Sequence, residues 1–201
     1  MKRDHYYCLL LLSFLAGQTF AQEKLWTETD RQFTIDQFNR TRDELVKETE
    51  NLTPAQWAFH ESADRWSIGQ IVEHLALWEI IWSREISMGT RNKPQPELNK
   101  TSRPDSYYSD FIMETNPHVS ADVAIPTGFI KGQDNLTFFL SRWQTNLAFL
   151  KKTDADMRAQ FELTATPNPR NMHQVYIFQW GHVDRHLRQI RKVKADPNFP
   201  K

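Results

Sequence analysis

Apolar residues recur at intervals of three and four along most of this chain, which is the period of an amphipathic α-helix. The pattern predicts four principal helices, and no stretch alternates convincingly as a strand does. The first helix is expected over residues 29–51, with inward positions at Phe33, Phe38, Leu45 and Leu52. Pro54 follows it, and proline there favours a turn or a new helix start.

The second helix has a well-marked start. Ser67 is the expected N-cap, and Gln70 stands three residues later, which completes a capping box. Gly89 is the expected C-cap. One arc of the helix is predicted to face inward and carries Ile71, His74, Leu75, Trp78, Ile81 and Trp82. The opposite arc carries Glu73, Ala76, Ser83 and Arg84.

About forty residues then lack sustained helical periodicity and contain several prolines. One interpretation is a crossover that returns the chain along a bundle between two parallel helices. The other is a disordered linker. We favour the crossover because the segment carries apolar side chains that disordered segments lack, namely Tyr107, Tyr108, Phe111, Ile112 and Phe129. A short helix is expected within it over residues 105–111.

Two further helices complete the predicted all-α four-helix bundle. The third is expected over residues 133–152, with Leu136, Phe139, Leu140, Trp143, Leu147 and Leu150 inward. The fourth opens at Asn171 as N-cap and continues to about Lys194. Its inward arc includes Gln179, Trp180, His182, Val183 and His186, whereas Asp184, Arg185, Arg188, Arg191 and Lys192 lie on the other side.

Three histidines share the inward arcs. His182 and His186 are four residues apart, so both imidazoles lie on one helix face, and His74 faces inward from the second helix. A lone inward histidine is usually a hydrogen-bonded core residue. Three would bury several polar rings at ~1–3 kcal/mol each if unpaired, a cost that a shared metal ion removes. Spacing alone leaves both interpretations open.

The remaining histidines are predicted to be ordinary, and they are His5, His60, His118 and His173. Gly181 precedes His182 and weakens the helix by ~1 kcal/mol relative to alanine. Close approach of a neighbouring segment is one explanation for a glycine at that position.

The chain begins with a basic start and a short apolar run, followed by small residues that end at Ala21. This pattern predicts a secretory signal peptide over residues 1–21 and a single mature domain over residues 22–201, periplasmic or secreted. The run is too short for a membrane-spanning helix. The only cysteine, Cys8, lies within the predicted signal, which excludes a disulfide or a thiol nucleophile from the mature chain. The 25 basic and 25 acidic residues balance, which argues against a nucleic-acid partner.

Four segments together resemble the DinB-like (DinB/YfiT) family. Residues 52–57 (LTPAQW) resemble the family's link after its first helix, and residues 66–75 are similar to its W-S-x-x-x-x-x-x-H-L segment. Residues 126–128 (PTG), followed by a helix with Arg142, resemble the lead into its third helix. Residues 182–190 (HVDRHLRQI) match its H-x-x-R-H-x-x-Q-I ending.

The resemblance implies an up-down-down-up bundle and one divalent metal ion, commonly zinc, nickel or iron, held by His74, His182 and His186. Activities known in the family include thiol transfer, maleylpyruvate isomerisation with a thiol, and metal-dependent hydrolysis. Export would place this chain outside the cytosolic thiol pool, which disfavours thiol transfer.

The sequence therefore predicts a metal-dependent hydrolase or transferase of a small molecule. The alternative is a non-catalytic metal- or ligand-binding module. Trp78, one turn from His74, would give a substrate an apolar wall. No acid is expected beside the histidines, since Glu73 and Asp184 point away, so no catalytic residue is assigned beyond the metal ligands. The expected partner is a small-molecule substrate, with no nucleic acid and no stable membrane anchor, and a homodimer is left open.

Overall fold

The computed structural model describes residues 24–116, 119–163 and 167–201. The expected signal peptide, with His5, and the loop residue His118 lie outside these ranges. The long helices are α1 (Glu28–Thr49), α3 (Ile68–Gly89), α5 (Asp134–Lys152) and α6 (Met172–Lys194). Two short helices, α2 (Pro54–Ala58) and α4 (Asp105–Ile112), and two 3-10 turns, η1 (Pro96–Lys100) and η2 (Asp122–Ala124), lie between them. The described ranges contain no β-strand, only an isolated bridge between Phe161 and Asn171.

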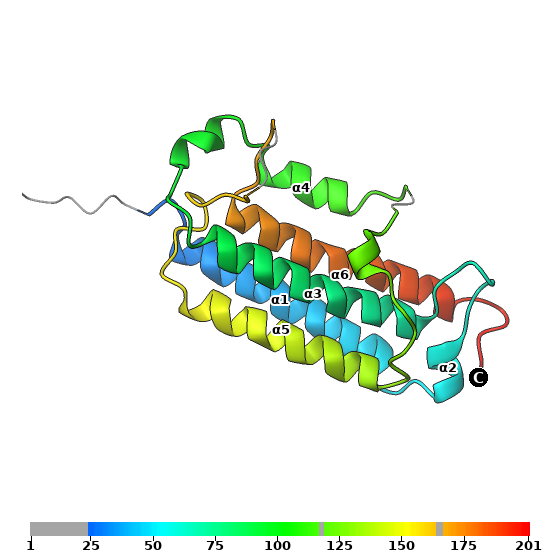
Figure 1. Ribbon diagram of the computed structural model, residues 1–201. Helices are drawn as coiled ribbons and strands as arrows, with labels where there is room; N and C mark the ends of the chain where they lie inside the picture. The colour runs from blue at the N-terminus through cyan, green and yellow to red at the C-terminus, as the bar shows by residue number, and fades with distance from the viewer. Residues whose placement is uncertain (1–23, 117–118, 164–166) are drawn as a thin grey trace, which may run out of the picture.

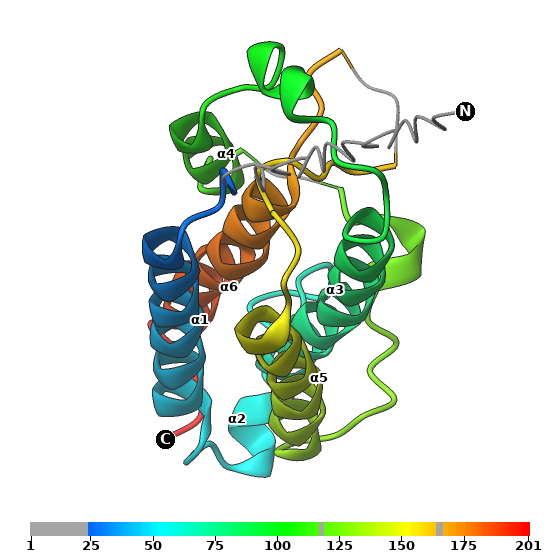
Figure 2. The same ribbon diagram turned by 90° about the vertical axis from the view of Figure 1, so that its left-hand side faces the viewer.

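The four long helices surround one core. Helix α1 packs on α5 and α6, and α3 packs on the same two helices from the other side (Figure 2). Helices α3 and α5 run in the same direction, opposite to α1 and α6 (Figure 1). The connection over residues 90–133 carries the chain back along the bundle between α3 and α5, and its helix α4 lies on α6. The predicted up-down-down-up bundle and its crossover are confirmed.

Capping boxes open the helices that position the site. Ser67 Oγ accepts from the Gln70 backbone N–H while the Gln70 side chain accepts from the Ser67 N–H, and Asn171 forms the same arrangement with Gln174. Such caps stabilise a helix by ~1 kcal/mol. The predicted C-cap at Gly89 is wrong, because the helix includes Gly89 and ends at Thr90 with right-handed backbone. A Cβ at Gly89 would lie 2.4 Å from Met172 Sδ, so glycine serves close packing there.

Helix α1 departs from the expected inward stripe at Phe33, whose side chain is 48% exposed. Three small polar residues, Thr34, Thr41 and Thr49, occupy the buried face instead. Each hydroxyl donates to the carbonyl four residues earlier, so no donor is left unpaired in the core. Phe38 and Leu45 are buried as predicted, and Leu52 is partly buried against the core.

Helix α3 is buried over more of its surface than one arc. Glu73 and Ala76, which were expected on the outer arc, are both buried. The reason is that α3 contacts α5 and α6 on two sides and also η2 of the crossover. The Glu73 carboxylate accepts hydrogen bonds from the backbone N–H groups of Thr127 and Gly128 and from the Thr127 hydroxyl, which fastens the crossover to α3.

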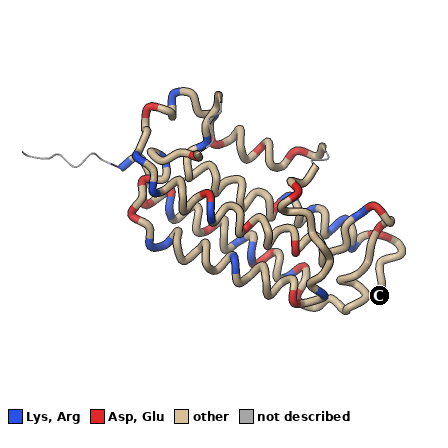
Figure 3. Tube along the Cα trace, in the orientation of Figure 1, with Lys and Arg blue, Asp and Glu red and all other residues tan. Residues whose placement is uncertain are grey.

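Gly181 allows α4 to lie close to α6. A Cβ at this position would stand 2.5 Å from Ile112 Cγ2, well inside van der Waals contact, so the close approach here is made by a side chain of α4 and not by the backbone of a neighbour. Charged residues of both signs are interspersed along the helices (Figure 3). Within the described ranges, none of the helices combines the length and the apolar character that a bilayer span requires.

Candidate metal centre

The structure brings His74 of α3 together with His182 and His186 of α6. Their side chains are buried, with 3%, 8% and 7% of their surface exposed. The Nε2 atom of His182 lies 3.3 Å from that of His74 and 3.0 Å from that of His186. One nitrogen from each ring lies within 4.8 Å of the other two. The predicted convergence of these three side chains is thus present.

Hydrogen bonds at the Nδ1 atoms of His74 and His186, which face away from the centre of the cluster, determine which ring nitrogens carry protons. His74 Nδ1 lies 2.7 Å from the Ala124 carbonyl oxygen, and His186 Nδ1 lies 2.8 Å from Gln189 Oε1. Both acceptors require an N–H at Nδ1, so the neutral rings of His74 and His186 present bare lone pairs at Nε2. These lone pairs point at His182 Nε2, which can offer them one proton at most. The centre of the cluster is therefore short of donors.

The arrangement fits a metal ion. Nitrogens bound tetrahedrally at ~2.0–2.1 Å stand about 3.3–3.4 Å apart, and the two Nε2 separations are 3.3 and 3.0 Å. Burial lowers the pKa of His182 well below its usual range and lowers that of His186 to about 3, and the Arg185 charge adds to both effects. Burial also lowers the pKa of His74. All three rings are then neutral near pH 7, the state that binds metals.

An aromatic cavity opens beside the histidines. Its volume is about 270 Å³. Rings of His74 and Trp66 lie 4.8 Å apart between centroids, and rings of His182 and Trp82 lie 5.2 Å apart. Trp78, the predicted apolar wall, lines the same cavity together with Phe111 and Phe178. Sequence periodicity identified Trp78 and Trp82 as inward residues, but Trp66 precedes its helix and carried no such signal.

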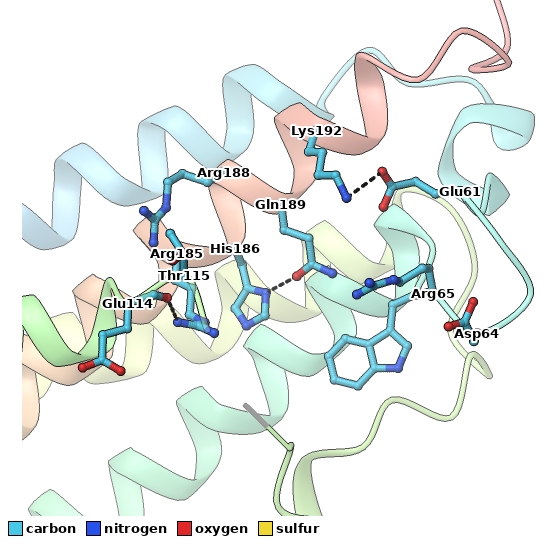
Figure 4. Close-up of a pocket in the computed structure, with 11 residues that line it drawn as sticks. Glu61, Asp64, Arg65, Glu114, Thr115, Arg185, His186, Arg188, Gln189 and Lys192 are labelled. Carbon is cyan, nitrogen blue, oxygen red and sulfur yellow. Dashed lines mark hydrogen bonds and ion pairs between the residues drawn. The ribbon is translucent and has the colours of Figure 1, made fainter. Parts of the chain in front are cut away.

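A second, more polar recess of about 550 Å³ reaches the cluster from the other side of His186 (Figure 4). Gln189 directs its amide oxygen at His186, and the side chains of Arg65 and Arg185 lie on either side of that histidine. Arg185 was expected on the solvent side of the fourth helix. It lines both the recess and the aromatic cavity instead, because α4 covers this part of α6.

The acidic residues next to the histidines in sequence, Glu73 and Asp184, are bound elsewhere, and the acidic residues of the polar recess are Glu61, Asp64 and Glu114. Glu73 binds the crossover backbone, and Asp184 accepts two hydrogen bonds from Arg40 of α1, so neither faces the cluster, as expected. Of the described residues that line the aromatic cavity, only Glu85 is acidic. It stands eleven residues after His74 on α3, roughly 16 Å along the helix. Burial raises the pKa of Glu85, and Arg170, 3.2 Å away, opposes that rise.

The two other described histidines lie outside the cluster. His60 is exposed and its Nδ1 contacts the Arg65 carbonyl oxygen. His173 is buried in the first turn of α6, where its Nδ1 accepts from Trp26 Nε1 and its Nε2 lies 3.4 Å from an Asp105 carboxylate oxygen. His173 is therefore a hydrogen-bonded core residue.

Comparisons with known proteins agree with this architecture. The family model of the DinB superfamily matches residues 37–190. The solved structure of YfiT from Bacillus subtilis, described as a probable metal-dependent hydrolase with an unusual four-helix bundle topology, superposes with a TM-score of 0.54 at 15% identity. The superposition covers 84% of this chain and 87% of that protein, and at this identity it establishes the fold alone. No curated protein matches the sequence.

Proposed function

This chain belongs to the DinB superfamily, and on that premise we propose that it binds one divalent metal ion and acts as a metal-dependent hydrolase or transferase of a small molecule. The proposed ligands are the Nε2 atoms of His74, His182 and His186, and the ion is zinc, nickel or iron. The observation that carries the proposal is the meeting of two bare lone pairs with a third imidazole nitrogen in a buried site. A cation is the partner that this arrangement lacks.

Residues around the ligands have distinct roles in this proposal. The Ala124 carbonyl and the Gln189 amide orient two of the imidazoles through their outer nitrogens. Trp66, Trp78 and Trp82 exclude water and contact the apolar part of a substrate. A divalent ion on three neutral ligands supplies Lewis acidity to a carbonyl oxygen and to water at its open position.

Hydrolysis is the reaction class that we favour. The description of B. subtilis YfiT as a probable metal-dependent hydrolase supports it by analogy of fold.

Thiol transfer is disfavoured by the proposed removal of residues 1–21 as a signal peptide, with the mature protein in the periplasm or outside the cell. N-terminal sequencing of the mature protein tests this: Gln22 as the first residue is expected, and an intact Met1 on a cytoplasmic protein would contradict export.

A metal- or ligand-binding module without catalysis is the second candidate. The distance of Glu85 from the histidines favours it, because a hydrolase usually has a general base within reach of the attacking water. The two candidates make the same prediction for metal binding and differ in turnover.

Metal content tests the site itself. Protein purified without a histidine tag is expected to contain about one divalent ion per chain, and the His186→Ala variant is expected to lose it. His60→Ala is the matched control, since His60 is exposed and lies outside the cluster. Equal metal content in the protein and in His186→Ala would refute the proposed ligands.

Turnover separates enzyme from binding module. Metal-loaded protein is screened against ester, amide and thiol-conjugation substrates beside the His182→Ala variant. Hydrolysis by the protein and not by the variant is expected. Tight metal binding without turnover of any of these substrates would favour the binding module.

A further inference from the structure

His186 lies between two cavities of different chemistry. The recess in Figure 4 is lined by charged side chains, and the other cavity is lined mainly by aromatic rings. Trp66, Arg185 and His186 line both. A ligand bound at the histidines therefore has an apolar side and a polar side, and Arg185 is the charged residue at the boundary.

The charge of Arg185 is not balanced by a carboxylate that contacts it in the described structure. Its hydrogen bonds go to backbone carbonyls after α4: Nη1 donates to the oxygens of Ile112 and Glu114, and Nη2 donates to that of Asn116 at 2.7 Å. The Glu114 side chain is directed away from the guanidinium in Figure 4. Carbonyl oxygens carry partial charge only, and the Glu114 carboxylate offsets the charge of Arg185 in part without contacting it, so Arg185 keeps part of its positive field toward the recess.

Arg188 lines the same recess and adds its positive charge to this field, and its Nη2 donates to a carbonyl oxygen, that of Met113, and not to a carboxylate. Other cations of the recess have acidic neighbours: Lys192 lies 3.3 Å from Glu61, and Arg65 is adjacent to Asp64, whose pKa is lowered mainly by a hydrogen bond from Ser62 and to a smaller extent by Arg65. The recess is therefore most basic near His186, on the side of α4, where Arg185 and Arg188 lie.

Arg185 also has unused donors of the right shape. A guanidinium has five N–H groups, and the three hydrogen bonds leave the Nε–H and one Nη2–H without a partner among the described residues. In a guanidinium, the Nε–H and the Nη2–H beside it can bind a carboxylate as a fork, through two parallel hydrogen bonds. Arg185 can therefore bind the carbonyl oxygens after α4 and still donate two hydrogen bonds to a ligand.

The aromatic cavity indicates what the apolar part of the ligand is. Trp78 and Trp82 lie with ring centroids 4.8 Å apart, and the cavity volume of about 270 Å³ is at the small end of ligand pockets. A single aromatic ring suits a small cavity with such walls.

We propose that the substrate of this site is a small arylalkyl carboxylate derivative, with its ring in the tryptophan cavity and its carboxylate on the Arg185 fork. Arg185 is then a specificity-determining residue beside the histidine cluster. The inference rests on the proposed function, since it assigns the substrate class of that same site. Its test uses binding to metal-free protein, so that it does not depend on metal content or on turnover.

The probes are phenylacetate and phenylacetamide, which have nearly the same shape and differ in charge. Protein dialysed against a chelator is titrated with each at low ionic strength, and quenching of tryptophan fluorescence reports binding. Phenylacetate is expected to bind about ten-fold more tightly, and Arg185→Gln is expected to remove that preference while phenylacetamide binding changes little. Arg142→Gln on α5 removes the same charge far from the recess and is expected to keep the preference.

Arg185 also fastens α4, so circular dichroism and unfolding of each variant are measured in parallel. Arg185→Lys keeps the charge and loses the fork, and it is expected to retain a weaker preference that disappears in high salt. Equal affinity of the native protein for both probes, binding of neither at millimolar concentration, or an unchanged preference in Arg185→Gln would each overturn the inference. If the protein as purified contains no metal but still prefers phenylacetate, the proposed metal site alone is refuted.

Discussion

Two polar clusters are buried in this bundle, and they differ in where their hydrogen bonds go. At the three histidines, bare nitrogens meet one another beside a cavity. Between α3, α5 and α6, the Glu79 carboxylate, 1% exposed, accepts from Asn146 Nδ2 and Gln179 Nε2, each at 2.6 Å. At the Glu79 cluster both amide donors reach the carboxylate and only the Gln179 Oε1 acceptor is left unpaired, whereas at the histidine cluster the two Nε2 lone pairs and the buried Nδ1 of His182 lack partners.

Burial of a polar group therefore does not by itself mark a functional site. Glu79 joins three helices, and its donors come from the two helices that pack on its own, so its cluster stabilises one arrangement of the bundle. The histidines lack the donors that their lone pairs need, and such a deficit calls for a ligand.

The largest expected effect is on folding stability at Glu79. Glu79→Ala leaves the Asn146 and Gln179 donors unpaired beside a new cavity, so the free energy of unfolding is expected to fall by about 4 kcal/mol. Glu79→Gln keeps an acceptor oxygen and is expected to lose about 1 kcal/mol. In metal-free protein, His182→Ala is expected to cost less than Glu79→Ala, because it removes a nitrogen that lacks donors. Urea unfolding measures all three, and equal losses at the two clusters would contradict the comparison.

The two clusters are also expected to give stability opposite dependences on pH. Burial raises the pKa of Glu79 to about 7 from 4.5, so its contribution is complete below pH 4.5 and is lost as pH rises towards 7, by about 3 kcal/mol. Burial lowers the pKa of His186 to about 3 from 6.5, so stability is lost as pH falls below 6.5, at about 1.4 kcal/mol per pH unit.

Difference curves from metal-free protein separate these effects. The stability of Glu79→Gln minus that of the native protein is expected to rise between pH 4.5 and 7.5, whereas the same difference for His186→Gln is expected to fall between pH 4.5 and 6.5. Chemical unfolding at each pH gives both curves, and curves of the same sign would show that one of the two clusters is assigned wrongly.

Local periodicity was sufficient to predict the four long helices and to place His74, His182 and His186 on inward faces, whereas the up-down-down-up order and a site shared by the three came from the resemblance to the DinB-like family. The first two features depend on which face of a helix is apolar, and that face is readable from residues three and four apart. Ser67 and Asn171 could be predicted as caps because capping chemistry is confined to four consecutive residues.

The features that sequence reasoning missed depend on contacts between distant segments. From the sequence, Glu79 is indistinguishable from an ordinary charged residue of a helix. It is buried only because α5 and α6 pack on two sides of α3. Arg185 reads as a solvent-facing residue until α4 covers α6. Contacts with other helices also decide the position of Phe33. The face of α1 that packs on them carries Thr34, Thr41 and Thr49, and Phe33 is exposed.

A smaller effect is expected from the orientation of one ligand. Gln189→Leu removes the acceptor at His186 Nδ1 and frees the ring to turn, so the dissociation constant for zinc is expected to rise about ten-fold. Gln70→Leu is an unsuitable control because Gln70 caps α3, whereas Gln32, exposed on α1, allows the matched Gln32→Leu change. Competition with a chromophoric chelator measures affinity, and equal affinity in Gln189→Leu would remove Gln189 from the site.

The smallest expected effect concerns Gly181, which separates the histidine end of the bundle from the Glu79 region. Alanine there gains ~1 kcal/mol of helix propensity, but its Cβ would overlap Ile112 Cγ2, and overpacking costs ~1–3 kcal/mol. Gly181→Ala is therefore expected to lower stability by about 1 kcal/mol and to move α4 away from α6. Ile112→Ala makes room for the added methyl group, so the double variant is expected to be more stable than the sum of the two single changes predicts. Thermal unfolding gives this coupling energy, and strict additivity would mean that α4 does not rest on Gly181.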